Sequence, residues 1–329
     1  MSSLKFLLIT QIKHRQKNDE IKGFTLIELL VAMLMAFLVI TPLMLFMMNL
    51  LEGDRKEQAK ATTEQEMQAA LDYIARDLQQ AIYVYDADGV ARNRNTTDIT
   101  LSGIQDQIPP VKTAPNCNDA NVCKPILVFW KREFLASSVG VTSATDTTRD
   151  DGYAYSLVAY YLITNTNGSN TTWSKQARIG RFQIRGQVNS DNTNTTNDTG
   201  FSPPPLDPNI TGSTLKERMN QWKTALTGSA SYTQPVTTLI DFISTTSPSI
   251  STNTSGVCPG TNASPKLVGS LTSGFYTCVD AAEVLAQVFI RGNALARIQN
   301  NNLNYQNSQR AYFPSASVRV QGRGFLLTK

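Results

Sequence analysis

The chain has 329 residues and a formal net charge of +4; 41% of its residues are hydrophobic and 17% are charged. This length suffices for one folded domain of ordinary core size or for two small ones. Most of the basic excess lies before residue 23, so the remainder is nearly neutral and has no Lys/Arg cluster of the kind that specific nucleic-acid binding requires. His14, the only histidine, lies in that same segment. A chain that loses the segment has no histidine to act as general base or metal ligand.

An apolar run occupies residues 24 to 51, and Glu28 is its only ionisable side chain. The run exceeds the roughly 20 residues that a helix needs to cross the hydrocarbon of a membrane. Basic residues dominate before it and mixed charges follow it, a pattern that keeps the N-terminus cytoplasmic. The sequence therefore predicts a single-pass protein of the cytoplasmic (inner) membrane whose C-terminal part is periplasmic or extracellular.

The segment before the run is not an ordinary secretory signal, which ends in a small-residue cleavage site after its apolar core. Here Gly23 precedes the core. One interpretation is an uncleaved signal anchor. The string KGFTLIELLVAM, residues 22 to 33, also resembles the class III signal of type IV prepilins and type II secretion pseudopilins. In that family a glycine stands at the cut, a phenylalanine follows it, and an acidic residue occupies the fifth mature position.

The resemblance implies cleavage after Gly23 by a prepilin peptidase, N-methylation of Phe24, and a role for Glu28 in recognising a neighbouring subunit. Electrostatics agrees with this role, because the cut creates a cationic amine at Phe24 and an opposite charge is the most favourable partner for a carboxylate in apolar surroundings. Pairing between subunits would fix the stagger of their helices. The alternative is that Glu28 lies near the membrane interface, hydrated or protonated.

The helix is expected to bend at Pro42, which removes one backbone hydrogen bond. Beyond the membrane run the helical period continues, which predicts an amphipathic exported half over residues 52 to 85. Asp72 and Arg76 are spaced to pair on its wet face. Its apolar stripe is expected to pack on the following domain and consists of Met67, Leu71, Ile74, Leu78 and Ile82.

The remainder, residues 86 to 329, is predicted to be a β-rich domain. Aromatic and β-branched residues favour strands at 125–134, 152–164 and 171–185, and Asn167-Gly168 predicts a hairpin between the last two. Two further strands are expected within 282–292 and 317–328. A long helix packed on an antiparallel sheet is an α+β fold, which is also what the pilin resemblance implies. The chain looks most similar to the larger minor pilins and the J-type pseudopilins.

Polar insertions are expected near residues 187–230 and 244–274, where Ser, Thr and Asn dominate. Within the first, residues 215–226 predict a short amphipathic helix that attaches the insertion to the sheet. Its apolar side consists of Leu215, Met219, Trp222 and Leu226.

Four cysteines, Cys117, Cys123, Cys258 and Cys278, all follow the membrane run. An even number in this position suits disulfides in an oxidising compartment, with three possible connectivities. Local pairing of Cys117 with Cys123 and of Cys258 with Cys278 is the favoured one. A zinc site is the alternative, disfavoured because the spacings are not C-x2-C.

The chain shows no phosphate-binding loop, and no catalytic residue, metal or cofactor is expected. Asp150-Asp151 and the pair Asp86 and Asp88 could supply paired carboxylates or bind calcium. Both pairs lie beside turn-forming residues, so solvated turns are the preferred interpretation. The chain is therefore not expected to be an enzyme.

The resemblance implies a structural subunit of a type IV pilus-like or secretion filament. Its partners would be the prepilin peptidase, other pilins through the N-terminal helix, and the inner-membrane assembly platform with, indirectly, its ATPase. The long basic leader and the Asn/Thr-rich insertions resemble pseudopilins of hormogonium polysaccharide secretion in filamentous cyanobacteria. This likeness favours polysaccharide secretion and gliding or surface motility, with polysaccharide as a further partner, over DNA uptake or twitching.

A second hypothesis is a membrane-anchored glycan-binding module or hydrolase, held by an uncleaved helix. Its candidate binding residues are the strand aromatics Trp130, Tyr160, Tyr161 and Trp173. Core packing is the competing role for each of them.

Overall fold

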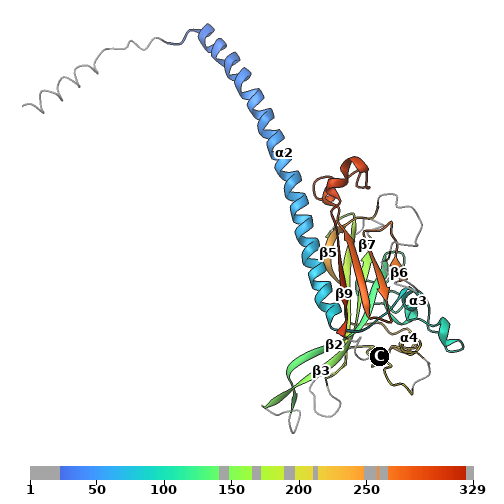
Figure 1. The fold of residues 1–329 in the computed structure, drawn as a ribbon. Helices are drawn as coiled ribbons and strands as arrows, with labels where there is room; N and C mark the ends of the chain where they lie inside the picture. Colours follow the sequence, from blue (N-terminus) through green and yellow to red (C-terminus); the bar gives the residue numbers. More distant parts are fainter. Residues whose placement is uncertain are drawn as a thin grey trace, which may run out of the picture. The chain divides into compact units, whose positions relative to one another are not determined.

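The computed structural model describes residues 23–140, 148–164, 172–188, 197–209, 214–247, 258 and 266–323. The chain divides into two compact units, residues 1–55 and 56–329. The helix α2 (Leu26–Gln79), blue in Figure 1, contributes to both units. Of the leader predicted for residues 1 to 23, only Gly23 lies within the described residues.

The described part of the first unit is the apolar half of α2. Leu, Met and Ala are strong helix formers, and the helix is continuous through Pro42 and Gly53. Just before the proline, the Thr41 hydroxyl donates to the backbone oxygen of Phe37 at 2.8 Å. The most apolar 18-residue window of α2 has a mean hydropathy of 2.7, and none of it is buried by other parts of the protein. By length and composition this half is suited to a single membrane span.

The second half of α2, predicted to be exported, ends at Gln79, six residues before the predicted end. The reason is local composition: the following residues are β-branched or aromatic and form the strand β1 (Ala81–Val84), in which every residue is buried. The helical members of the predicted stripe are buried as expected. Ile82 is buried too, but as part of the strand.

The first sheet is antiparallel with strand order β1-β2-β3-β4-β5. Its longer strands are β2 (Cys123–Gly140), β3 (Arg149–Ile163), β4 (Ala177–Arg185) and β5 (Thr237–Ile243). The strands predicted at 125–134, 152–164 and 171–185 are therefore present, and β3 pairs with β4 as the predicted hairpin requires. The predicted turn at Asn167-Gly168 lies outside the described residues. The strand β5 was not predicted.

The strands β2 and β3 extend past their other neighbours as a two-stranded ribbon, green in Figure 1. β1 pairs with β2 only as far as Lys131, and β4 pairs with β3 only from Ser156 onward. On the ribbon Phe134 packs edge-on against Tyr153, with ring centroids 5.5 Å apart. Both rings remain exposed.

Both faces of the first sheet are covered in its middle. Successive side chains of a strand point to opposite faces, so Lys131 reaches Asp77 of α2 while its neighbour Trp130 packs against Trp222, 5.5 Å between ring centroids. Trp222 follows the helix α4 (Leu215–Asn220). The predicted helix over 215–226 is therefore too long, although Trp222 and Leu226 are buried as expected. The insertion is attached to the sheet through these residues.

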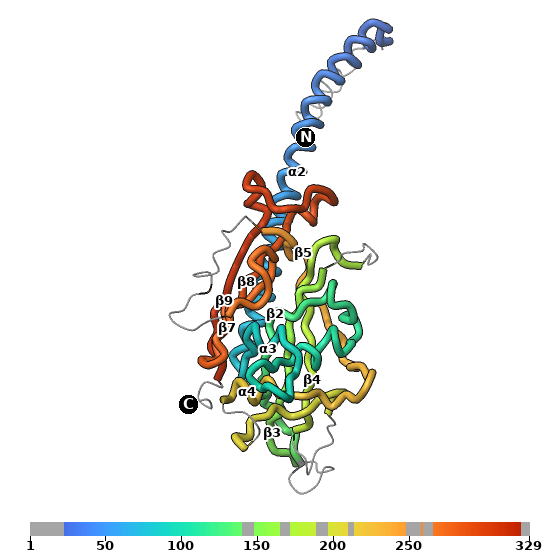
Figure 2. Tube along the Cα trace, turned by 90° about the vertical axis from the view of Figure 1, so that its right-hand side faces the viewer, coloured from blue at the N-terminus to red at the C-terminus, as the bar shows by residue number. Residues whose placement is uncertain are grey.

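A second antiparallel sheet has the order β6-β7-β8-β9. It consists of β6 (Lys266–Gly269), β7 (Phe275–Asp280), β8 (Leu285–Arg291) and β9 (Ser315–Gln321). β8 and β9 fall in the predicted strand regions, whereas β6 lies inside the stretch predicted as a polar insertion. In Figure 2 the strands β7 to β9 lie to one side of β3 and β4. A bridge between Ile243 and Gly292 joins the two sheets.

Short helices occupy the connections. They are α3 (Ala87–Ala91) and the 3-10 helices Ile99–Leu101, Gln105–Gln107, Ala294–Arg297 and Asn307–Tyr312. The result is an α+β fold with a long N-terminal helix and antiparallel sheets.

Candidate functional site

The predicted cleavage position lies in a short non-helical segment that precedes α2. Phe24 is 85% exposed. A methyl group built at Gly23 meets no atom of the described residues within 4 Å, and the backbone there is not in the left-handed region. The fold of the chain therefore sets no requirement for glycine at this position.

Glu28 forms a capping box with Thr25 at the start of α2. Thr25 donates from its backbone nitrogen and its hydroxyl to Glu28 Oε2, at 3.2 and 3.0 Å, and Glu28 N donates back to the hydroxyl at 3.3 Å. Both groups that hold the carboxylate are neutral, so the box orients it without neutralising its charge. The positive end of the helix dipole also favours a carboxylate here. The T-x-x-E pattern could have revealed this box from the sequence.

The cysteines form two disulfides, Cys117–Cys123 and Cys258–Cys278. This is the local pairing that the sequence favours. Since all four thiols are used, they are not available as zinc ligands. Within the described residues, no group of three or more His, Cys, Asp or Glu side chains is arranged to hold a metal ion.

A buried charge cluster fixes the last turns of α2 to the first sheet. Asp77 accepts from Lys131 Nζ of β2 at 2.9 Å, from the Tyr160 hydroxyl of β3 at 2.6 Å and from Arg181 Nε of β4 at 2.8 Å. Glu133 adds a second carboxylate against Lys131. One helical residue therefore contacts three adjacent strands, and the cluster balances two cations with two anions.

The charge cluster makes stability depend on pH. Burial alone would raise the pKa of the Asp77 carboxyl, but the hydrogen bond and charge of Arg181, aided by Lys131, hold it below its usual value. The folded-state pKa is therefore below the unfolded value of about 3.9. The resulting stabilisation is complete above that pH and is lost as the pH falls through the folded-state pKa.

We therefore expect the free energy of unfolding to fall as the pH drops below about 4, and to fall less steeply in Asp77→Asn, which has no carboxyl to protonate. Urea titrations of both proteins between about pH 6 and pH 2.5, followed by circular dichroism, measure the two slopes. If the free energy of unfolding fell with the same slope in both proteins, the pH dependence would not arise from Asp77.

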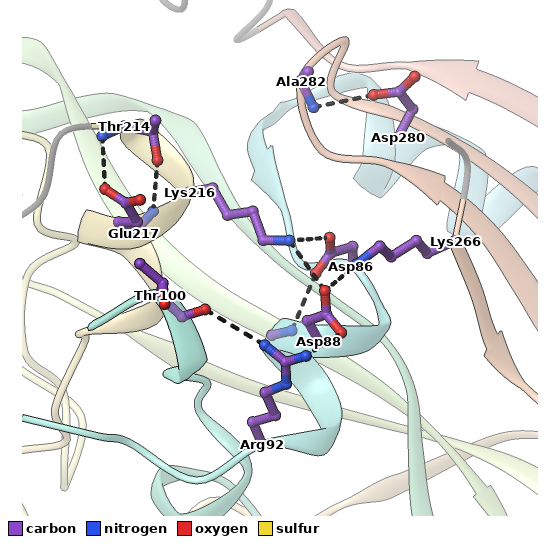
Figure 3. A network of polar contacts seen from close by, with 11 residues as sticks. Asp86, Asp88, Arg92, Thr100, Thr214, Lys216, Glu217, Lys266, Asp280 and Ala282 are labelled. Carbon is purple, nitrogen blue, oxygen red and sulfur yellow. Dashed lines mark hydrogen bonds and ion pairs between the residues drawn. The ribbon is translucent and has the colours of Figure 1, made fainter. Parts of the chain in front are cut away.

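Asp86 and Asp88 belong to a second polar cluster, shown in Figure 3. Asp86 accepts from Gly89 N at 3.0 Å, which caps α3, and pairs with Lys216 Nζ at 2.6 Å. Lys216 and Lys266 both contact Asp88. The Lys266 hydrogen bond is the main reason that the pKa of Asp88 lies below its usual value. The pair is therefore not a solvated turn: it links α3 to α4 and to the start of β6.

The other aspartate pair also differs from its prediction as a turn. Asp150 and Asp151 lie within β3. Asp151 Oδ1 accepts from the backbone nitrogen of Ser137 on the neighbouring strand at 2.9 Å. The carboxylate thus stabilises the ribbon at a bulge, where the φ of Ser137 is +50°.

Three of the four aromatics proposed as glycan ligands are core residues, because Trp130, Tyr160 and Tyr161 are fully buried. Trp173 alone of the four is exposed, at 37%. The prediction that Trp130, Tyr160 and Tyr161 bind glycans is therefore wrong.

The residues predicted for processing and subunit recognition lie together, within one turn of the start of α2. The charge clusters at Asp77 and Asp86 lie in the second unit and hold its elements together. Sequence reasoning did not predict either cluster. Comparison with models of protein families, with curated proteins and with solved structures gives no match for this chain.

Proposed function

We propose that the chain is a minor pilin or pseudopilin. In this role it is cut between Gly23 and Phe24, methylated at Phe24 and inserted through its helix into a type IV pilus-like or secretion filament. One observation carries the proposal: the string Gly-Phe-Thr-x-x-Glu spans the start of a 54-residue helix whose first half leaves its apolar side chains exposed. The second half of the same helix is buried along one stripe in a β-rich unit.

The two halves of α2 suit storage followed by assembly. Exposed apolar side chains are stable in a membrane, and in a filament they would pack against the helices of other subunits. The capping box orients the Glu28 carboxyl group at the helix start, where the amine of a neighbouring Phe24 can pair with it. The two disulfides suit an exported domain.

The assignment to a particular system rests on the resemblance of the leader and the insertions to pseudopilins of hormogonium polysaccharide secretion. The filament would serve polysaccharide secretion and gliding or surface motility. The partners are the prepilin peptidase, other pilins, the inner-membrane assembly platform and, indirectly, its ATPase. The N-terminus would be cytoplasmic before processing, and the second unit periplasmic or extracellular.

The intact mass and N-terminal sequence of protein from its native membrane test this proposal. We expect a chain that begins at methylated Phe24. Gly23→Ala is expected to abolish processing, because the added methyl meets no atom in the described part of the chain and is expected to act on recognition by the peptidase. Gly53→Ala is the matched control, since its added methyl also lies in open space, and its processing should be normal.

A wild-type chain that keeps residues 1 to 23 would overturn the proposal and favour the uncleaved, membrane-anchored binding module. Normal processing of Gly23→Ala would show that the cut, if present, does not depend on the glycine.

A further inference from the structure

An open groove of about 650 Å³ lies in the second unit beside α2 and β5. This volume is within the range of about 300 to 1,000 Å³ that is usual for small-molecule sites. Tyr73 of α2 and Trp173, in the segment before β4, line it. Tyr73 is 43% exposed, and Trp173 is the exposed aromatic noted above. Two large aromatic side chains thus remain accessible in one groove, where exposed apolar surface often marks a binding site.

The edge strand at this groove is deformed by a β-bulge. Ala177 faces Ile243 and Ile179 faces Ile240, so two residues of β5 lie opposite the single residue between them on β4. The second bulge residue, Phe242, has a φ of +59°, which is rare for a bulky side chain. Bulges and strained residues of this kind redirect side chains beside functional sites.

The first bulge residue, Asp241, holds the segment that carries Trp173. Its Oδ2 accepts from the backbone nitrogen of Ser174 at 2.7 Å, and its Oδ1 accepts from the Ser174 hydroxyl at 2.8 Å. The Arg178 guanidinium lies 5.7 Å from the centre of the Trp173 ring. Asp241 is therefore a positioning residue, and these contacts order the Trp173 ring before any ligand arrives.

A second guanidinium holds the other aromatic side chain. Arg181, which also pairs with Asp77, lies 5.6 Å from the centre of the Tyr73 ring. The ring is thereby tied to the buried charge cluster, so both aromatic walls of the groove are attached to fixed elements of the fold.

The composition of the groove identifies the class of ligand. Aromatic faces pack against the apolar C–H faces of sugar rings, and carboxylates and hydroxyls hydrogen-bond to sugar hydroxyl groups. Among the described lining residues the carboxylates are Glu66, which pairs with Arg297, and Asp241, and none is lysine or arginine. The Arg178 and Arg181 guanidiniums beside the groove lie against the aromatic rings, so no lysine or arginine among the described lining residues would compensate the charge of an acidic sugar. We infer that the groove binds a neutral polysaccharide chain. The inference does not rest on the proposed filament role, since the groove is equally available in an unprocessed chain.

Tryptophan fluorescence can test the inference selectively. Of the three tryptophans, Trp130 and Trp222 are buried, so quenching by acrylamide reports mainly on Trp173. The full chain is purified in a detergent without a sugar headgroup. It is then titrated with cellohexaose, maltohexaose and mannohexaose as neutral probes and with hexagalacturonate as the acidic one. We expect at least one neutral hexasaccharide to protect Trp173 from quenching, and hexagalacturonate to have no effect.

Binding measured by calorimetry should be at least about tenfold weaker in Tyr73→Ala and in Trp173→Ala. Phe134→Ala, which removes a 55% exposed aromatic from the ribbon, is the matched control and should bind normally. Unchanged circular dichroism of the variants confirms that they fold. The inference is overturned if no neutral probe binds, if only hexagalacturonate binds, if Trp173→Ala binds as wild type, or if self-association of the chain alone covers Trp173.

Discussion

Replacing Asp77 with alanine is expected to lower the free energy of unfolding of the second unit by about 3 kcal/mol, at the lower end of the range for breaking a buried ion pair. The reason is that the Lys131 and Arg181 side chains stay buried when their shared counter-charge is removed. Lys131 keeps Glu133 as a partner, which limits the loss. In the described part of the chain Arg181 forms no ion pair with a second carboxylate, so the uncompensated charge of Arg181 should account for most of the loss.

Urea unfolding of the full chain in detergent, followed by circular dichroism, gives the difference directly. Asp72→Ala is the matched control: this exposed aspartate lies on the same helix and loses only an exposed hydrogen bond from Gln68, while Arg76 Nε donates to its backbone oxygen, which alanine retains. We expect the control to change stability by less than about 0.5 kcal/mol. A loss below about 1 kcal/mol in Asp77→Ala would show that the cluster does not fix α2 to the sheet.

The features predicted correctly from the sequence are those encoded locally. Seven turns of apolar residues indicate a helix long enough for a membrane span, the stripe at Met67 to Leu78 indicates one packed face, and aromatic runs indicate β2 and β3. The end of α2 was misplaced because Ile82 fits both the helical stripe and a strand. Only the pairing of its neighbours Ala81 and Tyr83 with β2 decides between the two.

The charge clusters could not be predicted because their members are distant in sequence. Asp77 is 54 residues from Lys131 and 104 from Arg181, and Lys266 is 178 residues from Asp88. Nothing in the sequence marks such residues as partners until the sheets form. β6 was missed for a related reason: a short strand in a polar stretch gains its stability from its neighbour β7 rather than from its own composition.

Glu28→Gln is expected to reduce incorporation into filaments about thirtyfold, which corresponds to roughly 2 kcal/mol of lost charge pairing between subunits. Glutamine serves as well as glutamate at the third position of a capping box, so this variant retains the bond from Thr25 and removes only the charge. The quantity to measure is the ratio of filament-bound to membrane-bound chain in sheared-cell fractions. Intact mass must show that the variant is still processed after Gly23.

Thr25→Ala makes the opposite change: it removes the hydroxyl of the capping box and leaves the Glu28 charge in place. The helix start should loosen by about 0.5 to 2 kcal/mol, while incorporation remains close to wild type. If Glu28→Gln assembled normally and Thr25→Ala failed, Glu28 would serve the helix of its own subunit rather than its neighbour. Glutamine and glutamate side chains are equally long and differ at this site only in charge. A difference in assembly between Glu28→Gln and wild type therefore reports on the charge.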